Sequence, residues 1–288
     1  MNKIMLLTPA LMLDTNRKAN HKMMKSIADT FVFDQKVVYD QEFAESDYRD
    51  GYTYIGHAPK RMGFVTPRNE LLKYFYNSDF DYAIWFDANS NVSGPTVNDE
   101  RTLIDALRQG KIDVDCVYTT LGIIYSPERV AAKCAKDFFD VVHLLPYKTN
   151  YNWMHGMVMK NFKKYYNQEL YIHPDCDPWK GTSEDIYFTR LLSKVFDCHV
   201  CPTIVVNKPN SKTSTWMTTA GSYAYPKPEY GQIDDMIRKE LYKYTVTKRG
   251  IKDWVLPRVQ DESIENLKEY KPRPRHKSVA AETNKSLW

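Results

Sequence analysis

The sequence predicts an α/β fold in which helices flank a mostly parallel sheet. The main observation is that short apolar runs alternate with helix-like stretches through the first two-thirds of the 288 residues, a pattern typical of that class. A chain of this length can also bury one large core without disulfides or metals. With 43% hydrophobic and 26% charged residues, the composition excludes a disordered chain and a disulfide-built small protein.

The expected strands are short apolar or alternating runs that end in polar or turn-forming residues. The run from residue 82 to 86, for example, is apolar throughout and stops at Asp87. Because helix-like stretches separate most of these runs, the strands are expected to pair in parallel. The expected strands are residues 3–8, 36–40, 52–56, 82–86, 114–119, 154–160 and 200–206.

The expected helices begin at capping residues and carry apolar residues at helical spacing. Thr66 is the expected N-cap of one helix, with Pro67 at its first position. Ser126 and Ser183 are expected to cap two later helices, and Gly110 is expected to end another. The expected helices are residues 16–30, 68–76, 99–109 and 126–139, the stretch after Ser183, and residues 230–244.

We expect one core domain over residues 1–207 and a C-terminal extension, packed on that core, over residues 208–288. The extension reads as a loop, a helix and a basic tail, in which Pro272 and Pro274 prevent a regular helix. Residues 201–288 hold 16 Lys+Arg against 10 Asp+Glu, whereas the whole chain has a formal net charge of +4. Such a surplus attracts anions, although solvated surfaces often carry one as well.

No segment of the sequence reads as a membrane span or a secretory signal. The apolar stretches are far shorter than the roughly 20 residues that cross a bilayer. Pro9 and Asp14 interrupt the apolar residues near the start of the chain. Five cysteines, an odd number, suit a reducing compartment better than a disulfide framework. We therefore expect a cytoplasmic protein.

The most informative segment is the apolar strand that ends in Asp87, Ala88 and Asn89. Ligands of open α/β sheets bind at the carboxyl ends of the strands. Asp87 and Asn89 offer two oxygen ligands of the kind that a divalent cation on a diphosphate requires. Taken alone, an Asp after a strand is more often a residue that caps a turn.

Three other segments occur in a fixed order around this strand. Arg68 and Asn69 lie on the helix that precedes it, and the expected strand over residues 154–160 contains Gly156, three methionines and Lys160. A tryptophan-bearing loop over residues 178–183 then leads into Glu184, Asp185 and Ile186 at a helix start. In this order and spacing the chain resembles nucleotide-sugar glycosyltransferases of the GT-A fold, over residues 1–207. The resemblance implies a GT-A-like, Rossmann-like fold and makes residues 1–207 the catalytic core.

The resemblance implies a site for a divalent cation, Mn²⁺ or Mg²⁺, and for a nucleoside diphosphate sugar. Asp87 and Asn89 match the metal-binding Asp-x-Asp of the family, although a neutral Asn replaces the second acid and weakens the ligand set. Asn207 is the candidate for the position in which family members often have a histidine ligand. Thr8 and Asp40, at the ends of the first two strands, match positions that hold the nucleobase.

The resemblance also implies catalytic residues. Asp185, with Glu184 beside it, is the candidate general base that deprotonates the acceptor hydroxyl, as in inverting members of the family. The positive end of the helix favours the ionised form of both acids, although acids also occur at helix starts for stability alone. Arg68 is placed to reach a phosphate, and Trp153 or Trp179 to stack on the sugar.

A second arrangement of possible ligands suggests structural zinc. His173 and Cys176 form one pair, and Cys198 and Cys201 form another, at a spacing that zinc sites allow. The alternative is that these small cysteines fill the core, since the second pair lies on a turn into a strand.

The prediction of the acceptor rests on the composition and charge of the sequence and not on a motif. The Lys- and Tyr-rich composition, the basic tail and the lack of a membrane segment resemble T-even-type phage enzymes that glycosylate hydroxymethylcytosine in DNA. That likeness places the protein in the host cytoplasm and makes double-stranded DNA a partner, with phosphate contacts from basic residues. The candidates for those contacts are Lys208, Lys212, Arg273, Arg275 and Lys277.

The sequence therefore predicts a metal-dependent hexosyl- or pentosyltransferase. It uses a nucleoside diphosphate sugar, expected to be a UDP-sugar, and acts with inversion, although retention stays open. The expected acceptor is hydroxymethylated or glucosylated cytosine in phage DNA. One alternative keeps the chemistry but exchanges the acceptor for a surface glycan or a protein. A second is a non-enzymatic basic α/β protein that binds nucleic acid.

Overall fold

The computed structural model describes residues 1–13, 16–42, 51–58, 63–91, 97–121, 145–146, 156–176, 184–206, 235–237 and 239. The chain divides into two compact units, Met1–Pro228 and Glu229–Trp288. The sheet and the candidate site belong to the first unit. In the second unit, residues 235–237 and 239 are helical. None of the helices in the described ranges is long and apolar enough to cross a membrane.

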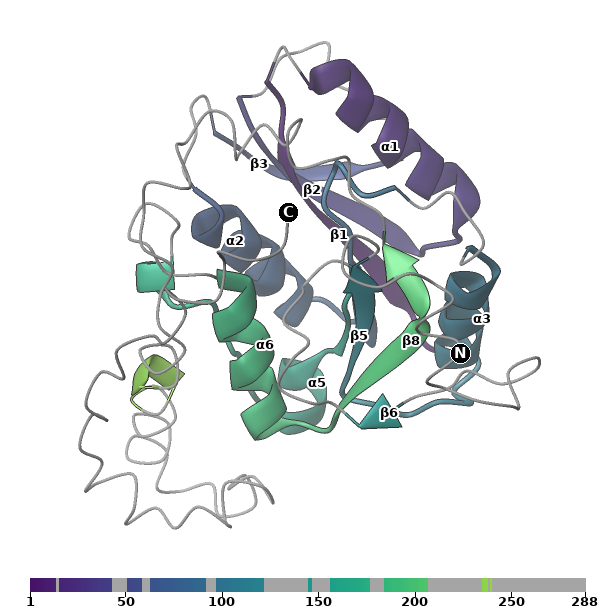
Figure 1. Cartoon of the computed structure of the whole chain (residues 1–288), viewed down its shortest axis with the longest axis vertical. Helices are drawn as coiled ribbons and strands as arrows, with labels where there is room; N and C mark the ends of the chain where they lie inside the picture. Colours follow the sequence, from purple (N-terminus) through teal and green to yellow (C-terminus); the bar gives the residue numbers. More distant parts are fainter. Residues whose placement is uncertain are drawn as a thin grey trace, which may run out of the picture. The chain divides into compact units, whose positions relative to one another are not determined.

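Strands and helices alternate along the first unit (Figure 1). The strands are β1 (Ile4–Leu11), β2 (Gln35–Gln41), β3 (Thr53–Ala58), β4 (Tyr82–Trp85), β5 (Cys116–Leu121), β6 (Leu145–Pro146), β7 (Val158–Lys160) and β8 (Cys198–Val206). The helices are α1 (Arg17–Thr30), α2 (Val65–Tyr76), α3 (Val97–Arg108), α5 (Phe162–Tyr166) and α6 (Glu184–Val195), with a 3₁₀ turn η1 (Pro174–Cys176).

Within the described residues the strands form one eight-stranded sheet in the order β3-β2-β1-β4-β7-β5-β8-β6. Strands β1 to β4 run parallel to one another. Strand β7 is antiparallel to both β4 and β5, and β6 is antiparallel to β8, which itself pairs in parallel with β5. Six of the eight strands therefore point the same way. The predicted fold class, an α/β fold with a mostly parallel sheet flanked by helices, is confirmed.

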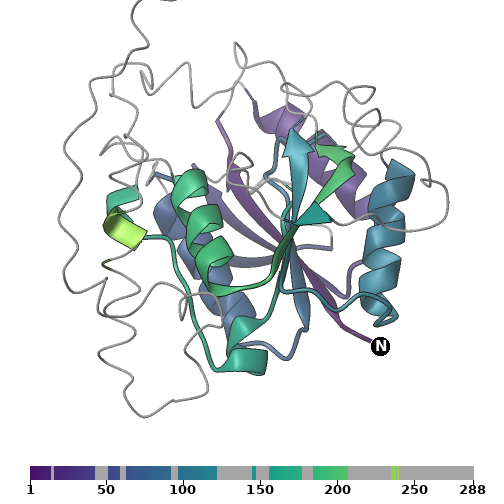
Figure 2. The same cartoon turned by 60° about the horizontal axis from the view of Figure 1, so that its bottom comes forward.

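Helices cover both faces of this sheet, which explains why β1 is buried along nearly its whole length. On one face, α1 and α3 pack against the side chains of β1 that point to that face, such as Ile4 and Leu6. The helix residues in this cluster include Met24, Ile27, Leu103 and Leu107. On the other face lie α2 and α6 (Figure 2). The carboxyl ends of the parallel strands are open to loops at one edge, here called the carboxyl edge, and the opposite edge is called the amino edge.

Most expected elements are present, with differences at their ends. Helix α2 begins at Val65 with Phe64 as N-cap, and no side chain caps it, so the prediction that Thr66 is the N-cap was wrong. Pro67 then lies within the first turn, where a missing N–H leaves no hydrogen bond unmade. Strand β6 and the short helix α5 were not expected. The expected helix at 126–139 lies outside the described residues.

Gly156 fixes the approach of β7 to its neighbours. Its φ is +71°, a left-handed conformation that glycine adopts readily. A Cβ at this position would lie 2.6 Å from Thr119 Oγ1 and 2.7 Å from Val206 Cγ2. Its N–H donates to the backbone oxygen of Trp85 at 2.6 Å. Glycine is therefore required where β7 meets the end of β4, directly before Asp87.

Candidate functional site

The candidate site begins where β4 ends. Past Trp85 the chain stays paired with β1, because Phe86 N–H donates to the Leu7 oxygen and Ala88 N–H donates to the Pro9 oxygen. A turn follows, in which Ser90 N–H donates to the Asp87 oxygen at 2.9 Å. This extension carries Asp87 to the carboxyl edge, where parallel strands present ligand-binding side chains.

Arg68 organises the site from the first turns of α2. Its side chain is 2% exposed and is packed by Phe64 and Trp85, whose ring centroids lie 5.3 and 6.0 Å from the guanidinium carbon. Its Nη1 donates to Glu184 Oε1 at 2.9 Å and to Asp185 Oδ1 at 2.6 Å. Its Nη2 donates to Asp87 Oδ1 at 3.4 Å. One buried guanidinium thus joins the end of β4 to the start of α6.

Helix α6 reaches this point because its buried side holds it against the sheet. Tyr187, Phe188, Leu191 and Leu192 are all buried, and Tyr118 of β5 donates its hydroxyl to the Thr189 oxygen at 3.1 Å. The first turn, which contains Glu184 and Asp185, is thereby directed to the carboxyl edge.

Asn69, next to Arg68, fixes the segment that leads toward α6. Its side-chain nitrogen donates to the Ile172 oxygen at 2.8 Å, and its side-chain oxygen accepts from Ile172 N–H at 2.9 Å. These two hydrogen bonds satisfy both backbone polar groups of Ile172, as pairing with a neighbouring strand would. Asn69 belongs to the predicted family motif, but its contact with Ile172 was not predicted, because residue 172 lies in a segment without periodicity.

The cluster carries more negative than positive charge. Three carboxylates, with side chains 10–15% exposed, face one guanidinium, which leaves two net negative charges when all are ionised. Burial lowers the pKa of Arg68, but the charges of Asp185, Asp87 and Glu184 outweigh it, so the guanidinium stays protonated. Burial, followed by the charge of Asp185, raises the pKa of Glu184 to about 8.

The raised pKa of Glu184 corrects our expectation that both acids at this helix start are ionised. A helix dipole contributes only about 0.3–1 kcal/mol near an exposed terminus. Removing a carboxylate from water shifts its pKa by up to about 3–5 units. Glu184 is therefore neutral at pH 7, and Asp185, which is the more exposed of the two, is the better candidate for a base.

The structure differs from the prediction at three further positions. Arg68 was expected to face a phosphate, and its guanidinium instead faces three carboxylates. Thr8 was expected to face the nucleobase, and its side chain is fully buried. By strand alternation Thr8 lies on the same side as Ile4 and Leu6, toward α1 and α3 and away from Arg68. Asp40 is likewise fully buried.

Asn89 keeps an oxygen available beside this cluster. Its Oδ1 is buried and has no hydrogen-bond partner in the part of the chain that the structure describes. A buried acceptor without a partner is unfavourable unless a ligand satisfies it. The remaining predicted site residues lie outside the described residues. These are Trp153, Trp179, Asn207, Lys208, Lys212, Arg273, Arg275 and Lys277.

The zinc alternative is not supported. His173, Cys176, Cys198 and Cys201 are all described, and no group of three or more His, Cys, Asp or Glu among the described residues could hold a metal ion. Cys198 Sγ lies 3.6 Å from the Tyr118 hydroxyl, whereas Cys201 packs in the core on the α1 and α3 side. Two residues three apart in a strand point to opposite faces, so this pair cannot converge.

Neither a protein-family model nor a curated protein matches the chain. Among solved structures, residues 1–349 of TarS from S. aureus match with a TM-score of 0.46 and 14% identity, over 90% of this chain and 77% of that one. A 4-diphosphocytidyl-2C-methyl-D-erythritol synthase from Anaerococcus prevotii matches with a TM-score of 0.40 and 12% identity, over 77% and 94%. A mycobacterial protein gives 0.40 and 12%, over 80% and 77%. Likenesses this remote carry no information about chemistry, which rests on the residues around Arg68.

Proposed function

We propose that this chain is a glycosyltransferase that moves a sugar from a nucleoside diphosphate sugar, expected to be a UDP-sugar, to an acceptor hydroxyl. The observation that carries the proposal is the meeting of Asp87 and Asp185 on one buried guanidinium at the carboxyl edge. These carboxylates are 98 positions apart in the sequence. A site of this kind supplies both an anchor for a charged donor and a base for an acceptor.

Asp185 is the proposed general base. Its Oδ1 is held at 2.6 Å by Arg68, while the side chain remains 15% exposed, so the carboxylate is oriented and still reachable. A carboxylate within hydrogen-bond reach of a sugar or alcohol hydroxyl can take its proton as the glycosidic bond forms, which yields inversion. Glu184, being buried and neutral, is proposed to position Asp185 through the shared Arg68 and not to act as the base.

The proposed cofactor is a divalent cation, Mn²⁺ or Mg²⁺. Two observations fit it: the net negative charge that Asp87 and Asp185 leave around Arg68, and the buried Asn89 Oδ1 without a partner among the described residues. Asp87 and Asn89 would hold the ion, and phosphate oxygens of the donor would complete its ligands, as is usual for Mg²⁺. When bound, the cation stabilises negative charge on the leaving diphosphate.

The proposed acceptor is hydroxymethylated or glucosylated cytosine in phage DNA. The surplus of Lys and Arg in residues 201–288 supports an anionic acceptor. A hydroxymethyl group on cytosine projects into the major groove, where an enzyme can reach it without flipping the base. A purely nucleic-acid-binding protein is disfavoured because it gives no role to three carboxylates gathered on one buried guanidinium.

The proposal is tested by incubating the protein and Mn²⁺ with radiolabelled UDP-sugars and three acceptors: hydroxymethylcytosine DNA, unmodified DNA and a set of oligosaccharides. We expect label to enter only the hydroxymethylated DNA. Label in oligosaccharides alone would keep the transferase and refute the DNA acceptor. Absence of both transfer and donor hydrolysis with every UDP-sugar, at any divalent cation, would refute the proposed function.

A further inference from the structure

Helix α1 carries its charges in an unfavourable order. Arg17 and Lys18 lie in its first turn, Lys22 and Lys25 follow, and the helix has no acid before Asp29. Cations are unfavourable at the positive end of a helix. Lys18 and Lys22 also stand at i and i+4, where like charges repel. This order of charges therefore lowers the stability of the isolated helix.

Three other described helices, α2, α3 and α6, each carry at least one charge where the helix dipole favours it, whereas α1 carries none, although α2 likewise has no acid in its first turn. Helix α6 has Glu184 and Asp185 in its first turn and Lys194 in its last. Helices α2 and α3 have Lys73 and Arg108 in their last turns. Helix α1 has neither an acid at its start nor a base at its end. Natural sequences depart from local stability mainly where function requires it.

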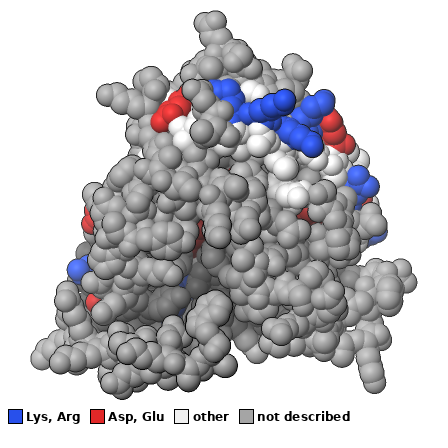
Figure 3. Space-filling model, turned by 45° about the horizontal axis from the view of Figure 1, so that its top comes forward, with Lys and Arg blue, Asp and Glu red and all other residues white. Residues whose placement is uncertain are grey.

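The lysines of α1 form an exposed stripe. Lys18, Lys22 and Lys25 are exposed, whereas Asn20, Met24 and Ile27 on the opposite side are buried. The blue band along the upper part of Figure 3 shows Lys and Arg side chains gathered on the surface. Lys25 pairs with Asp29 at 3.3 Å. Within the described ranges Lys18 and Lys22 make no hydrogen bond or ion pair.

The stripe has the dimensions of a phosphate backbone. From Lys18 to Lys25 the helix rises about 10 Å, at 1.5 Å per residue. One strand of a DNA duplex presents a phosphate about every 3.4 Å along its axis, so about three phosphates lie within this length. An anionic membrane is a poorer match, because the apolar side of α1 is buried in the core and none remains to enter a bilayer.

The stripe also begins at the functional edge of the sheet. Helix α1 follows directly after β1, and the end of β1 is paired with the segment that carries Asp87. Arg17 fixes this start of the helix, since its Nη2 donates to the backbone oxygens of Met12 and, at 2.8 Å, of Glu42. A polymer held along α1 would therefore pass the carboxyl edge.

We propose that the Lys18, Lys22 and Lys25 stripe of α1 binds the phosphate backbone of double-stranded DNA. The choice of DNA as the source of the phosphates rests on the proposed function, whereas the surface and its charge do not. Binding is electrostatic and independent of base sequence. It releases cations that are condensed on the DNA phosphates, and it relieves the repulsion within α1.

The test is the salt dependence of binding to a fluorescein-labelled 24-base-pair duplex, measured by fluorescence anisotropy from 50 to 300 mM NaCl with the full chain and without donor sugar. The variant is Lys18→Gln/Lys22→Gln. The matched control is Lys73→Gln/Lys111→Gln, which removes two exposed lysines elsewhere. We expect the α1 variant to bind about tenfold or more weakly at low salt and to lower the slope of log K against log[NaCl] by about 2. The control should keep both the affinity and the slope of the parent.

Three results would overturn the inference: no duplex binding by the parent at 50 mM NaCl, an α1 variant with the slope of the parent, or an equal loss in the control. Loss of binding to phosphatidylserine vesicles, with DNA binding intact, would assign the stripe to a membrane surface instead. Because no donor is present, failure here leaves donor hydrolysis and sugar transfer as separate readouts of the proposed function. A thermal melt of both variants verifies that they are folded.

Discussion

Each of the two edges of the sheet holds a buried cation among carboxylates, but the negative charge of the carboxylates is compensated at only one edge. At the amino edge, Lys160 Nζ lies 2.5 Å from Asp113 Oδ1 and 3.8 Å from Asp115 Oδ1. Asp113 is 80% exposed, so water solvates it. The hydroxyls of Tyr82 and Tyr166 donate to these two carboxylates. The charges at this edge are therefore paired or hydrated.

At the carboxyl edge, three carboxylates depend on Arg68 and little water reaches them. The pKa of Glu184 is raised because burial and a neighbouring charge disfavour its ionised form. The pKa of Asp113, by contrast, is lowered, chiefly by its hydrogen bond from Lys160. This difference indicates that the charges at the amino edge stabilise the fold, whereas the carboxyl edge keeps an excess of negative charge that a cationic ligand would neutralise.

The sharpest contrast between the two edges is expected on removal of each cation. Arg68→Met leaves buried carboxylates without a counter-charge and should lower the free energy of unfolding by about 3–5 kcal/mol. Lys160→Met should lower it by only about 1–2 kcal/mol, since Asp113 is hydrated and Asp115 keeps other donors. Urea unfolding of the two variants measures this. An equal or larger loss for Lys160→Met would contradict the comparison.

The next effect concerns pH. A carboxyl group with a raised pKa in the folded state contributes stability that is fully present below its unfolded pKa and is lost as pH rises through the folded pKa. For Glu184 that window extends from its ordinary value of 4.5 to about 8. The free energy of unfolding should therefore fall by on the order of a few kcal/mol between pH 5 and 8.

Glu184→Gln is the control for this pH effect, because glutamine is neutral throughout and keeps the shape of the protonated acid. Urea unfolding at pH 5, 6, 7 and 8 should show a flatter profile for the variant than for the parent. The charges that act on the pKa of Glu184 are those of Asp185, Arg68 and Asp87, and the thiol of Cys176 interacts with Glu184 as well. The pKa of the Cys176 thiol is raised by burial, out of this window. A parent profile that is flat, or that rises with pH, would contradict a neutral Glu184.

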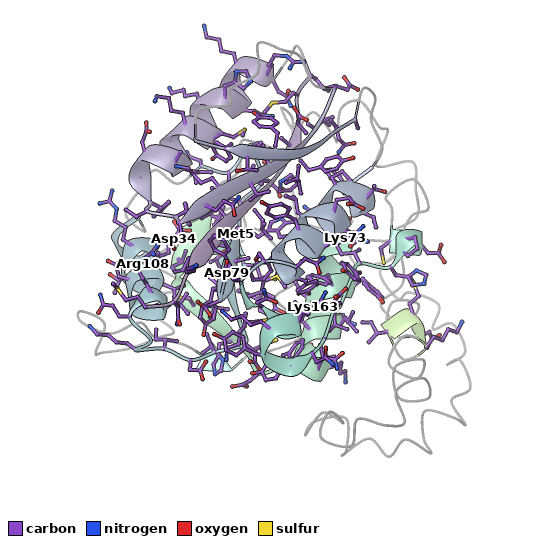
Figure 4. All side chains as sticks on the ribbon, turned by 180° about the vertical axis from the view of Figure 1, so that it is seen from behind. Met5, Asp34, Lys73, Asp79, Arg108 and Lys163 are labelled. Atoms are coloured by element: carbon purple, nitrogen blue, oxygen red, sulfur yellow. The ribbon has the colours of Figure 1, made fainter. Side chains whose placement is uncertain are left out.

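Binding of UDP and Mn²⁺ should directly reveal the excess negative charge at the carboxyl edge. UDP with Mn²⁺ at about 100 times their dissociation constant should stabilise the parent by about 2.7 kcal/mol, measured as a rise in Tm. Asp87→Ala should lose most of this rise, and EDTA should abolish it in the parent. Asp79→Asn, an exposed acid at the amino edge labelled in Figure 4, should keep it. A rise that survives Asp87→Ala would remove Asp87 from the metal and diphosphate site.

The smallest effect is expected for an exposed pair at the amino edge. Arg108 and Asp34 lie together in Figure 4, with Nη1 and Oδ2 2.6 Å apart. Exposed ion pairs contribute about 0–1 kcal/mol. Arg108→Gln should therefore change the free energy of unfolding by less than Lys160→Met, as measured by urea unfolding. A larger loss would mean that the amino edge is more tightly coupled than its hydration indicates.

The sequence could predict much of the fold because apolar periodicity and strand-ending polar residues mark strands and helices. It also placed Asp87 at a strand end and Asp185 at a helix start, positions that a parallel sheet brings to one edge. It could not show that Arg68 joins them, since that contact spans 117 positions. Burial of Glu184, which decides its protonation, likewise depends on packing and not on a local pattern.

Two other features, the short helix α5 and the basic stripe of α1, are visible in the sequence, although they were not predicted from it. The short helix α5 is bounded by Asn161, whose side chain accepts from Lys164 N–H at 3.2 Å, and by Asn167 in the left-handed conformation. Two capping asparagines thus mark a helix too short to show periodicity. The basic stripe of α1 is likewise visible as four cations without an acid over residues 17–25.

The most direct test of the account is the rate of sugar transfer by Asp185→Asn. We expect a loss of kcat of about 10²–10⁴-fold, the usual contribution of a general base, with unchanged affinity for UDP and Mn²⁺. Asp79→Asn serves as the matched Asp-to-Asn control and should retain the parent rate. Transfer by Asp185→Asn at the parent rate would contradict the claim that Asp185, held beside Asp87 by Arg68, is the base of this site.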